Sequence, residues 1–315
     1  MREESRDGFE FVPMLYPFNR KDAIKIVEGS HSIEEYRDYI IKHGIDKAEI
    51  VMPDLNILRL CPALKHLRIC PSHSASANFD FSSLYEMPYE MPEIKSLSCE
   101  NQYGNQEQLF SDIDYSRVHG IVDLKIAVNK GALNYNKIET LKSLSVGGFK
   151  GKNYDLTDLF CSKELDTLRI VQCGISSLNG IDISNKMQCL YLHYNRSLQN
   201  ISALRRANRT LKALRIENCP KIEDFSVLCE LENLELLELS GSNVLPNLNF
   251  LKTMRNLKTF AFNMDVLNGD LTPCLNLSYV YSEKDRRHFN LKDKDLPKTN
   301  YARGNEDIEE WRRLE

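Results

Sequence analysis

The chain has 315 residues, of which 42% are hydrophobic and 27% are charged, so it can bury a packed core and is not globally disordered. Its formal net charge of −4, with acidic and basic residues interspersed, excludes a general attraction to nucleic acid or to an anionic membrane. The opening stretch MREESRDGFE lacks the apolar run of a secretory signal, and no apolar run is long enough to span a bilayer. We therefore expect a cytoplasmic protein whose nine cysteines stay reduced.

Residues 1–44 are predicted to form an N-terminal cap. Ser32 and Glu35 form a capping box, which predicts a helix over IEEYRDYIIKH that ends at Gly44. Two earlier stretches, FVPMLYPF and AIKIVEG, predict strands. Such a cap would cover the first turn of a repeat array, whose core is otherwise open to water. A small separate recognition element is the alternative interpretation of this region.

Residues 45–285 contain an internal repeat of about ten to eleven units. Every unit is apolar at positions one, four and six, except that Ser282 occupies position six of the last. The units are IDKAEI, LKHLRI, IKSLSC, IVDLKI, LKSLSV, LDTLRI, MQCLYL, LKALRI, LELLEL, LKTFAF and LSYVYS. From residue 121 onward successive units begin 20 to 24 residues apart, and longer steps before that point indicate insertions at 70–93 and 100–120. Alternating apolar positions predict a short strand, and stacked strands can bury the apolar side chains that a single strand cannot.

The rest of each unit predicts how the chain returns to the next strand. A second apolar pair follows in most units, as at Ile175 and Leu178 or Leu248 and Leu251, and predicts a short helical turn. Just past the strand, side chains that can satisfy buried backbone groups recur at Cys173, Asn195, Cys219 and Ser242.

This pattern, L-x-x-L-x-L-x-x-N/C-x-(I/L), resembles the leucine-rich repeat family, in particular the 22-residue class seen in bacterial internalins and a phosphatase regulatory subunit. The stretch LRIENCPKIEDFSVLCELENLELLEL shows it best, whereas the units at 64, 94, 121 and 141 lack the Asn/Cys position. The resemblance implies an α/β fold: a curved leucine-rich-repeat solenoid with a parallel sheet on the concave face and a helical or irregular convex side.

One motif suggests a different chemistry. The stretch GGFKGKN, which begins at Gly147, is similar to a loop that binds phosphate. The motif requires four residues between its glycines and then Lys-Ser or Lys-Thr. Only three residues separate Gly147 from Gly151, and Asn153 stands where the hydroxyl should be. We interpret this stretch as the loop that leaves a repeat strand.

Residues 286–315 are predicted to form a charged tail and a C-terminal capping helix. Asn305 can cap a helix over the last residues, and Ile308, Trp311 and Leu314 fall near one of its faces. Docking of the Trp311 helix onto the last repeat is the expected arrangement. A protruding helix that binds a partner is the alternative.

No catalytic constellation is apparent, and none of the seven histidines has the spacing of a metal ligand pair. We therefore expect no catalytic residue, no metal and no cofactor. Position five of each strand points outward on the concave face, where Arg and Tyr can supply binding energy to a partner. The predicted binding residues are Arg169, Tyr191, His193, Tyr194, Arg215, Glu217 and Glu238.

The function expected from these features is that of a non-enzymatic module that binds an unidentified protein through the concave face, with no nucleic acid or membrane as a partner. By analogy alone, a bacterial regulator or an immunity protein would fit. The alternatives are a secreted or surface ligand-binding repeat protein and an enzyme with an unrecognised site. The alternative interpretation of the predicted binding residues is that they lie on a solvated sheet face that binds no partner, with Arg and Glu paired across strands.

Overall fold

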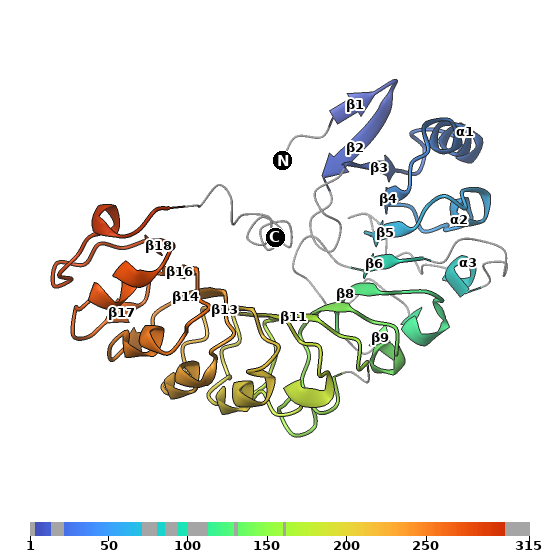
Figure 1. Cartoon of the computed structure of the whole chain (residues 1–315). Helices are drawn as coiled ribbons and strands as arrows, with labels where there is room; N and C mark the ends of the chain where they lie inside the picture. The colour runs from blue at the N-terminus through green and yellow to red at the C-terminus, as the bar shows by residue number, and fades with distance from the viewer. Residues whose placement is uncertain are drawn as a thin grey trace. The chain divides into compact units, whose positions relative to one another are not determined.

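The computed structural model describes residues 4–13, 22–70, 81–85, 94–99, 113–128, 132–159 and 162–299. The chain divides into two compact units, the first Met1–Ser143 with Glu310–Glu315 and the second Leu144–Glu309 (Figure 1). The expected boundaries at residues 44 and 285 stay predictions. The Trp311 helix and most of the two insertions lie outside the described residues.

The first unit is a sheet whose strand order follows the chain. Its first two pairings are antiparallel, and every pairing from β3 to β8 is parallel. The strands are β1 (Glu4–Arg6), β2 (Phe9–Pro13), β3 (Asp22–Ile26), β4 (Lys47–Ile50), β5 (His66–Ile69), β6 (Ser96–Cys99) and β8 (Asp123–Ala127). Two short parallel strands, β7 (Ile113–Asp114) and β9 (Ala132–Leu133), pair separately.

The predicted capping helix is present as α1 (Ile33–His43). The Glu35 amide donates to the Ser32 hydroxyl (3.2 Å), and the Ser32 amide donates to the Glu35 carboxylate (2.7 Å). Gly44 ends the helix with a positive φ of 61°, a conformation that glycine adopts without steric cost. Tyr36 and Ile40 are the buried residues of this helix. Two shorter helices follow in this unit, α2 (Ile57–Leu60) and α3 (Ser82–Tyr85).

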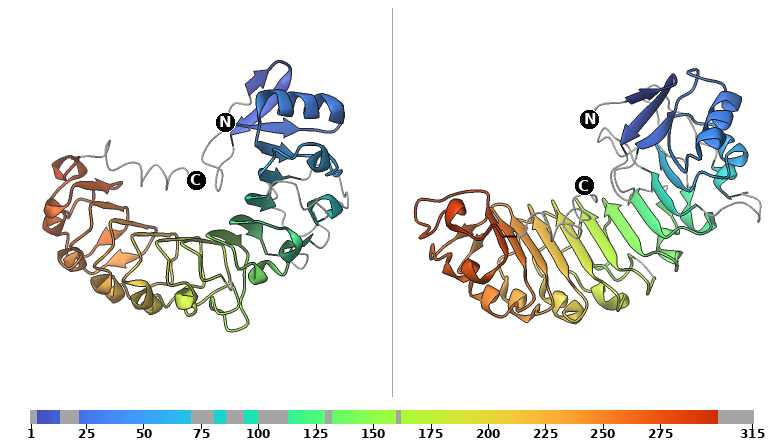
Figure 2. Two further views of the ribbon diagram at one scale, coloured as in Figure 1. Left: turned by 45° about the vertical axis from the view of Figure 1, so that its right-hand side comes forward. Right: turned by 45° about the horizontal axis from the view of Figure 1, so that its top comes forward.

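The second unit contains one parallel strand per repeat. The strands pair in the order β10 (Ser143–Gly147), β11 (Thr167–Val171), β12 (Cys189–His193), β13 (Ala213–Glu217), β14 (Leu236–Ser240), β16 (Thr259–Phe262) and β18 (Tyr279–Ser282). The 3-10 turns η3 (Ile181–Ile183), η4 (Ser202–Ala207), η5 (Ser226–Glu230), η6 (Asn249–Lys252) and η7 (Thr272–Asn276) return the chain. A side pair is formed by β15 (Val244–Leu245) and β17 (Asp265–Val266). Within this unit the sheet lines the inner side of a curve and the 3-10 turns form its outer side (Figure 2).

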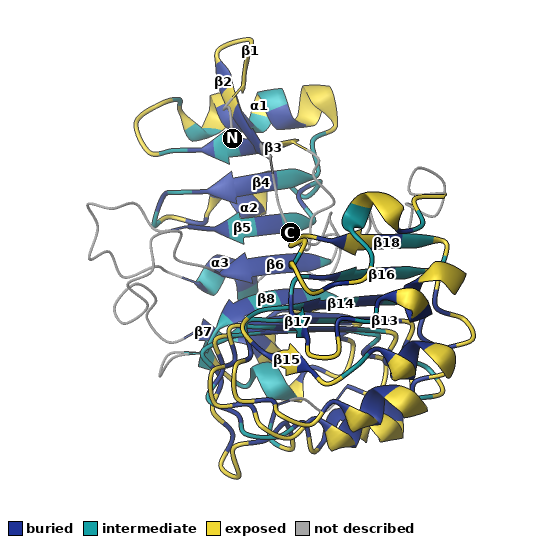
Figure 3. Ribbon diagram, turned by 90° about the vertical axis from the view of Figure 1, so that its left-hand side faces the viewer, coloured by how far each residue is buried: buried dark blue, intermediate teal, exposed yellow. Residues whose placement is uncertain are grey.

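The core of the second unit lies between these two layers. The fourth positions of neighbouring repeats lie in register, since Leu168, Leu190, Leu214, Leu237 and Phe260 are paired in succession and are fully buried. The second apolar pairs close the core from the outer side, and the 3-10 turns expose only their outer faces (Figure 3). All eleven strands predicted for the repeat units are present, and the predicted fold class, an α/β solenoid built on a parallel sheet, is confirmed.

A line of buried polar groups runs beside this core. The Asn195 amide donates to Ile170 O (2.9 Å), and its oxygen accepts from the Cys173 amide (2.9 Å). The thiol of Cys219 points to Leu192 O (3.8 Å). In the next repeat the prediction is wrong by one residue: Ser242 is exposed, and Asn243 is buried and donates to Cys219 O (3.1 Å). We call Cys173, Asn195, Cys219 and Asn243 the polar spine.

The last strand of the second unit is covered by the chain that follows it. Val280 N donates to Pro297 O (2.9 Å), and Lys298 forms an antiparallel bridge with Tyr279. Asp293 accepts from Ser282 N (2.8 Å) and from the Lys298 ammonium (2.6 Å). This C-terminal strap, residues 283–299, pairs the outer edge of β18. Within the described ranges, no helix has both the length and the apolar character needed to cross a bilayer.

Candidate functional site

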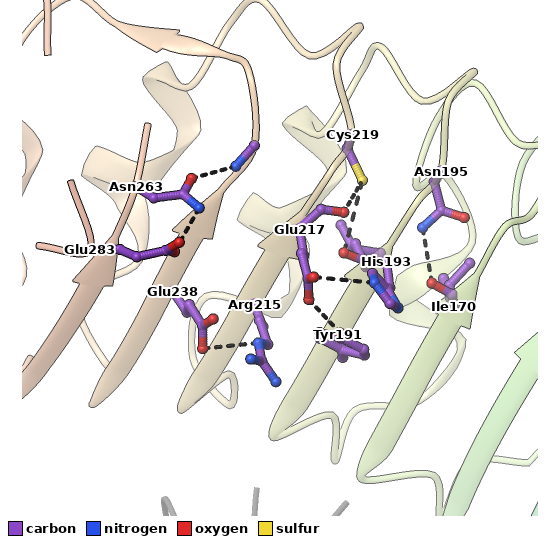
Figure 4. A network of polar contacts seen from close by, with 12 residues as sticks. Ile170, Tyr191, His193, Asn195, Arg215, Glu217, Cys219, Glu238, Asn263 and Glu283 are labelled. Carbon is purple, nitrogen blue, oxygen red and sulfur yellow. Dashed lines mark hydrogen bonds and ion pairs between the residues drawn. The ribbon is translucent and has the colours of Figure 1, made fainter. Parts of the chain in front are cut away.

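The register of four strands aligns six of the seven predicted binding residues in two rows on the outward face of the second unit, and Tyr194 lies just past the end of its strand. Position five gives the row Arg169, Tyr191, Arg215 and Glu238, one residue from each of β11 to β14. Position seven gives the adjacent row Val171, His193, Glu217 and Ser240. The predicted outward column is therefore confirmed for this part of the chain. Its side chains form a connected network (Figure 4).

Tyr191 is the centre of this network and is nearly buried. The guanidinium carbons of Arg169 and Arg215 lie 4.5 Å and 5.0 Å from the centre of its ring. Its hydroxyl donates to Glu217 (2.7 Å). Burial, and then the hydrogen bond to Glu217, raise the pKa of Tyr191 far above its ordinary value. Because only 7% of Tyr191 is exposed, it positions its neighbours and has little surface of its own to offer a partner.

Glu217 holds two of these side chains at once. One carboxylate oxygen accepts from Tyr191, and the other lies 3.2 Å from His193 Nε2. The His193 contact, the Tyr191 hydroxyl and the nearby positive charges outweigh burial and lower the pKa of Glu217 to about 2. Glu217 is therefore a fixed negative charge at any pH near neutrality.

The two arginines are held differently. Arg215 Nε lies 2.9 Å from the Glu238 carboxylate, and the side chains of both residues are mostly buried. This is the cross-strand Arg–Glu pairing that the solvated-face alternative expected. It does not account for the arginine–tyrosine–arginine stack, because a surface pair needs no aromatic ring between two cations. Stacked guanidinium groups lose little freedom on contact with a partner, since their orientation is already fixed.

Tyr194 lies next to this network and is the most exposed of the predicted binding residues. It follows β12 in the left-handed conformation with φ of 54°, and 38% of it is exposed. Its ring lies 4.3 Å from the His193 ring, and its amide donates to Glu217 O (2.9 Å). Each neighbouring repeat has a positive φ at the same point, where the residues are Gly148, Gln172, Asn218 and Gly241.

The first unit carries outward polar residues that are not among the predicted binding residues. Arg68 pairs with Glu49 (3.1 Å), whose side chain is only 5% exposed. Glu49 occupies position five of the first repeat unit, IDKAEI, so the repeat register would have identified it. On the adjacent row Ser96 donates to Asp123 (2.9 Å) and contacts His66 Nδ1 (2.9 Å). Ser96 is 1% exposed and is hydrogen-bonded to a carboxylate, so these three residues do not form a nucleophile that a substrate can reach.

The described ranges contain no group of three or more His, Cys, Asp or Glu side chains that could hold a metal ion. Eight cysteines in these ranges have free thiols, and six of them are buried. Burial raises the pKa of the Cys173 thiol to about 12 and that of Cys219 to about 11, so both spine thiols stay protonated and unreactive.

No family model matches the chain, and no curated protein matches it in sequence. Among solved structures, it is similar to the functional domain of InlJ from Listeria monocytogenes, which includes a cysteine ladder. The two share 15% sequence identity with a TM-score of 0.47, over 75% of this chain and 56% of that one. The chain thus spans a little over half the length of that structure, and the likeness concerns architecture alone.

Proposed function

We propose that this chain is a non-enzymatic module that binds a partner protein through the outward sheet face of its second unit. The observation that carries the proposal is the network around Tyr191. Two arginines, a histidine and two glutamates from strands β11 to β14 are held in fixed positions in this network. Arginine and tyrosine are the residue types that most often dominate binding energy at protein interfaces. The eight free thiols within the described ranges suit a reducing compartment, and we propose that the module acts in the cytoplasm.

The structure changes which of these residues would meet the partner. Tyr191 is almost inaccessible, whereas Arg169, His193, Glu217, Glu238 and Tyr194 keep part of their surface. The buried ring therefore supports the contact residues instead of making the contact. A preformed arrangement of this kind favours binding because less side-chain entropy is lost on association.

The test is capture of partners from a lysate of the source organism by the whole chain, followed by calorimetry with each purified partner. Arg169→Glu reverses one charge in the network, and Arg209→Glu makes the same change at an exposed residue next to the outer turn η4. Both variants must keep the thermal unfolding midpoint of the wild type. Tyr191 should not be replaced in this test, because removal of a buried ring creates a cavity.

A partner that binds the wild type and Arg209→Glu, but binds Arg169→Glu at least tenfold more weakly, supports the proposal. Loss of binding by about that factor is expected when one charged group of a partly buried contact is reversed. A partner that binds all three proteins equally would move the binding site away from this face and refute the assignment.

A further inference from the structure

Tyr194 stands at a position where its backbone conformation favours other residues. Five successive repeats reach a positive φ just after the strand, and the other four place Gly, Gln, Asn and Gly there. Bulky side chains rarely adopt this left-handed conformation, which glycine and asparagine tolerate. A tyrosine that is both strained and partly exposed is not explained by packing, since the core lies on the opposite face of the strand.

The surroundings of Tyr194 are suited to a cation. One neighbour of its ring is His193, at 4.3 Å, and the His193 Nε2 atom in turn lies 3.2 Å from the Glu217 carboxylate. Glu217 is ionised and its side chain is 24% exposed. No cation lies over the Tyr194 ring in the part of the chain that the structure describes.

The same chain shows what such an arrangement accepts. Three residues earlier, the ring of Tyr191 receives guanidinium groups from Arg169 and Arg215, while its hydroxyl is fixed by the carboxylate of Glu217. Tyr194 places a second ring at the end of the strand, against His193, which contacts the same carboxylate. No guanidinium of the described chain lies over this second ring.

We propose that Tyr194, His193 and Glu217 form a subsite for an arginine side chain of the partner protein. The arginine lies over the exposed Tyr194 ring and directs its guanidinium toward the Glu217 carboxylate. This subsite deepens the proposed function and rests on it, since it names the chemistry of one contact on the same face. Arginine fits better than lysine because a planar guanidinium can stack on the ring and hydrogen-bond to a carboxylate at once.

The experiment uses the whole chain with histidine labelled in the ring, and the His193 signal assigned by its loss in His193→Gln. N-acetyl-arginine amide and N-acetyl-lysine amide are titrated separately while the His193 ring signal is followed. The subsite predicts a saturable shift with the arginine probe, and binding of the lysine probe that is weaker by about threefold or more.

Three variants separate the subsite from general effects. Tyr194→Asn removes the ring while suiting the left-handed backbone, so its thermal midpoint should equal or exceed that of the wild type. Glu217→Gln removes the charge. Both should weaken the arginine probe by about threefold or more, whereas Gln172→Asn, the same kind of change one repeat earlier, should leave it unaltered.

The absence of a saturable shift with the arginine probe would overturn the subsite, and so would equal affinity for the two probes or unchanged affinity in Tyr194→Asn. These outcomes are independent of the partner capture. A partner that still requires Arg169 while the arginine probe fails would retain the binding face and remove only the arginine subsite.

Discussion

At the scale of single residues, Glu217 shows how a side chain on an outward sheet face can become structural. Its carboxylate accepts the Tyr191 hydroxyl at 2.7 Å and lies 3.2 Å from His193. The contacts lower its pKa from 4.5 to about 2, which means that the folded chain holds the ionised form more favourably than the unfolded chain does. The network is therefore stabilised by charge as well as by stacking of the arginines on the Tyr191 ring.

The pKa of Glu217 gives a prediction with a defined sign. A group whose pKa is depressed on folding contributes stability above its unfolded pKa, and that contribution is lost as the pH falls toward its folded pKa. Glu217→Gln should therefore destabilise the chain by about 1–2 kcal/mol at pH 7, after allowance for solvent screening, and by much less near pH 3. Urea unfolding of both proteins across this pH range measures the difference.

The matched control for this comparison is Glu235→Gln. Glu235 lies just before β14 and pairs with Lys258 at 2.6 Å, but the lysine side chain is 64% exposed. Its replacement should change the unfolding free energy by about 0.5 kcal/mol or less. A Glu217→Gln penalty that stayed the same between pH 7 and pH 3 would show that the carboxylate charge does not stabilise the network.

At the scale of the repeat element, each repeat combines a strand, a left-handed residue and a spine residue. The hydrogen bonds of these parts are complete only when a neighbouring repeat is present. The left-handed residue of one repeat donates its amide to the next strand, as Tyr194 does to Glu217 and Asn218 does to Ser240. The spine residue then satisfies backbone groups of the preceding repeat, as Asn195 does for Ile170. Each repeat is thereby hydrogen-bonded to the next at two points beyond the strands themselves.

Asn195 offers the sharpest test of this coupling. It is fully buried, and its amide group pairs with Ile170 O and Cys173 N at 2.9 Å each. Asn195→Ala leaves both backbone groups without a partner in a dry interior, so the free energy of unfolding should fall by about 2–4 kcal/mol. Urea unfolding measures the loss, and amide hydrogen exchange should show it first around β11 and β12.

Ser242→Ala is the control at the position where the sequence pattern wrongly placed the next spine residue. Because Ser242 is exposed, its replacement should change stability by about 0.5 kcal/mol or less. Asn243→Ala should instead resemble Asn195→Ala, since Asn243 donates to Cys219 O and Ile222 O. Equal, small effects at Asn195 and Asn243 would contradict the role given to the spine.

The strands were predictable from the sequence because a period of two within a strand and a recurrence of 20 to 24 residues leave little freedom of register. The prediction of the polar spine was wrong at one repeat because one extra residue separates β14 from its spine residue. Gly241 adopts a φ of 137° at this point, and the repeat pattern does not reveal the extra residue. The outward rows followed from position alone. The burial of Tyr191 did not, because it depends on how the long Arg169 and Arg215 side chains fold over the ring.

At the scale of the whole molecule, each unit has an end strand, and an end strand of a repeat array leaves its backbone groups unpaired on one side. The first unit ends in the short strand β1, which is exposed, carries Glu4 and Arg6, and is paired on one side by β2. In the second unit the C-terminal strap pairs with the edge of the end strand β18. The backbone of Val280 pairs with Pro297, and Asp293 binds both Ser282 N and Lys298.

Release of the strap should convert the edge of β18 into a site of association. Asp293→Ala removes the acceptor for Ser282 N and the ion pair with Lys298, so both the strap and the last strand lose a fixed point. We expect the free energy of unfolding to fall by about 1–2 kcal/mol and the variant to form concentration-dependent oligomers through the freed edge. Light scattering coupled to gel filtration measures the mass over a range of concentrations. Asp182→Ala is the control, because it breaks an exposed ion pair with Arg206 on the outer side and should keep the mass of the wild type. If Asp293→Ala has the same mass as this control at every concentration, the strap does not prevent association through the edge of β18.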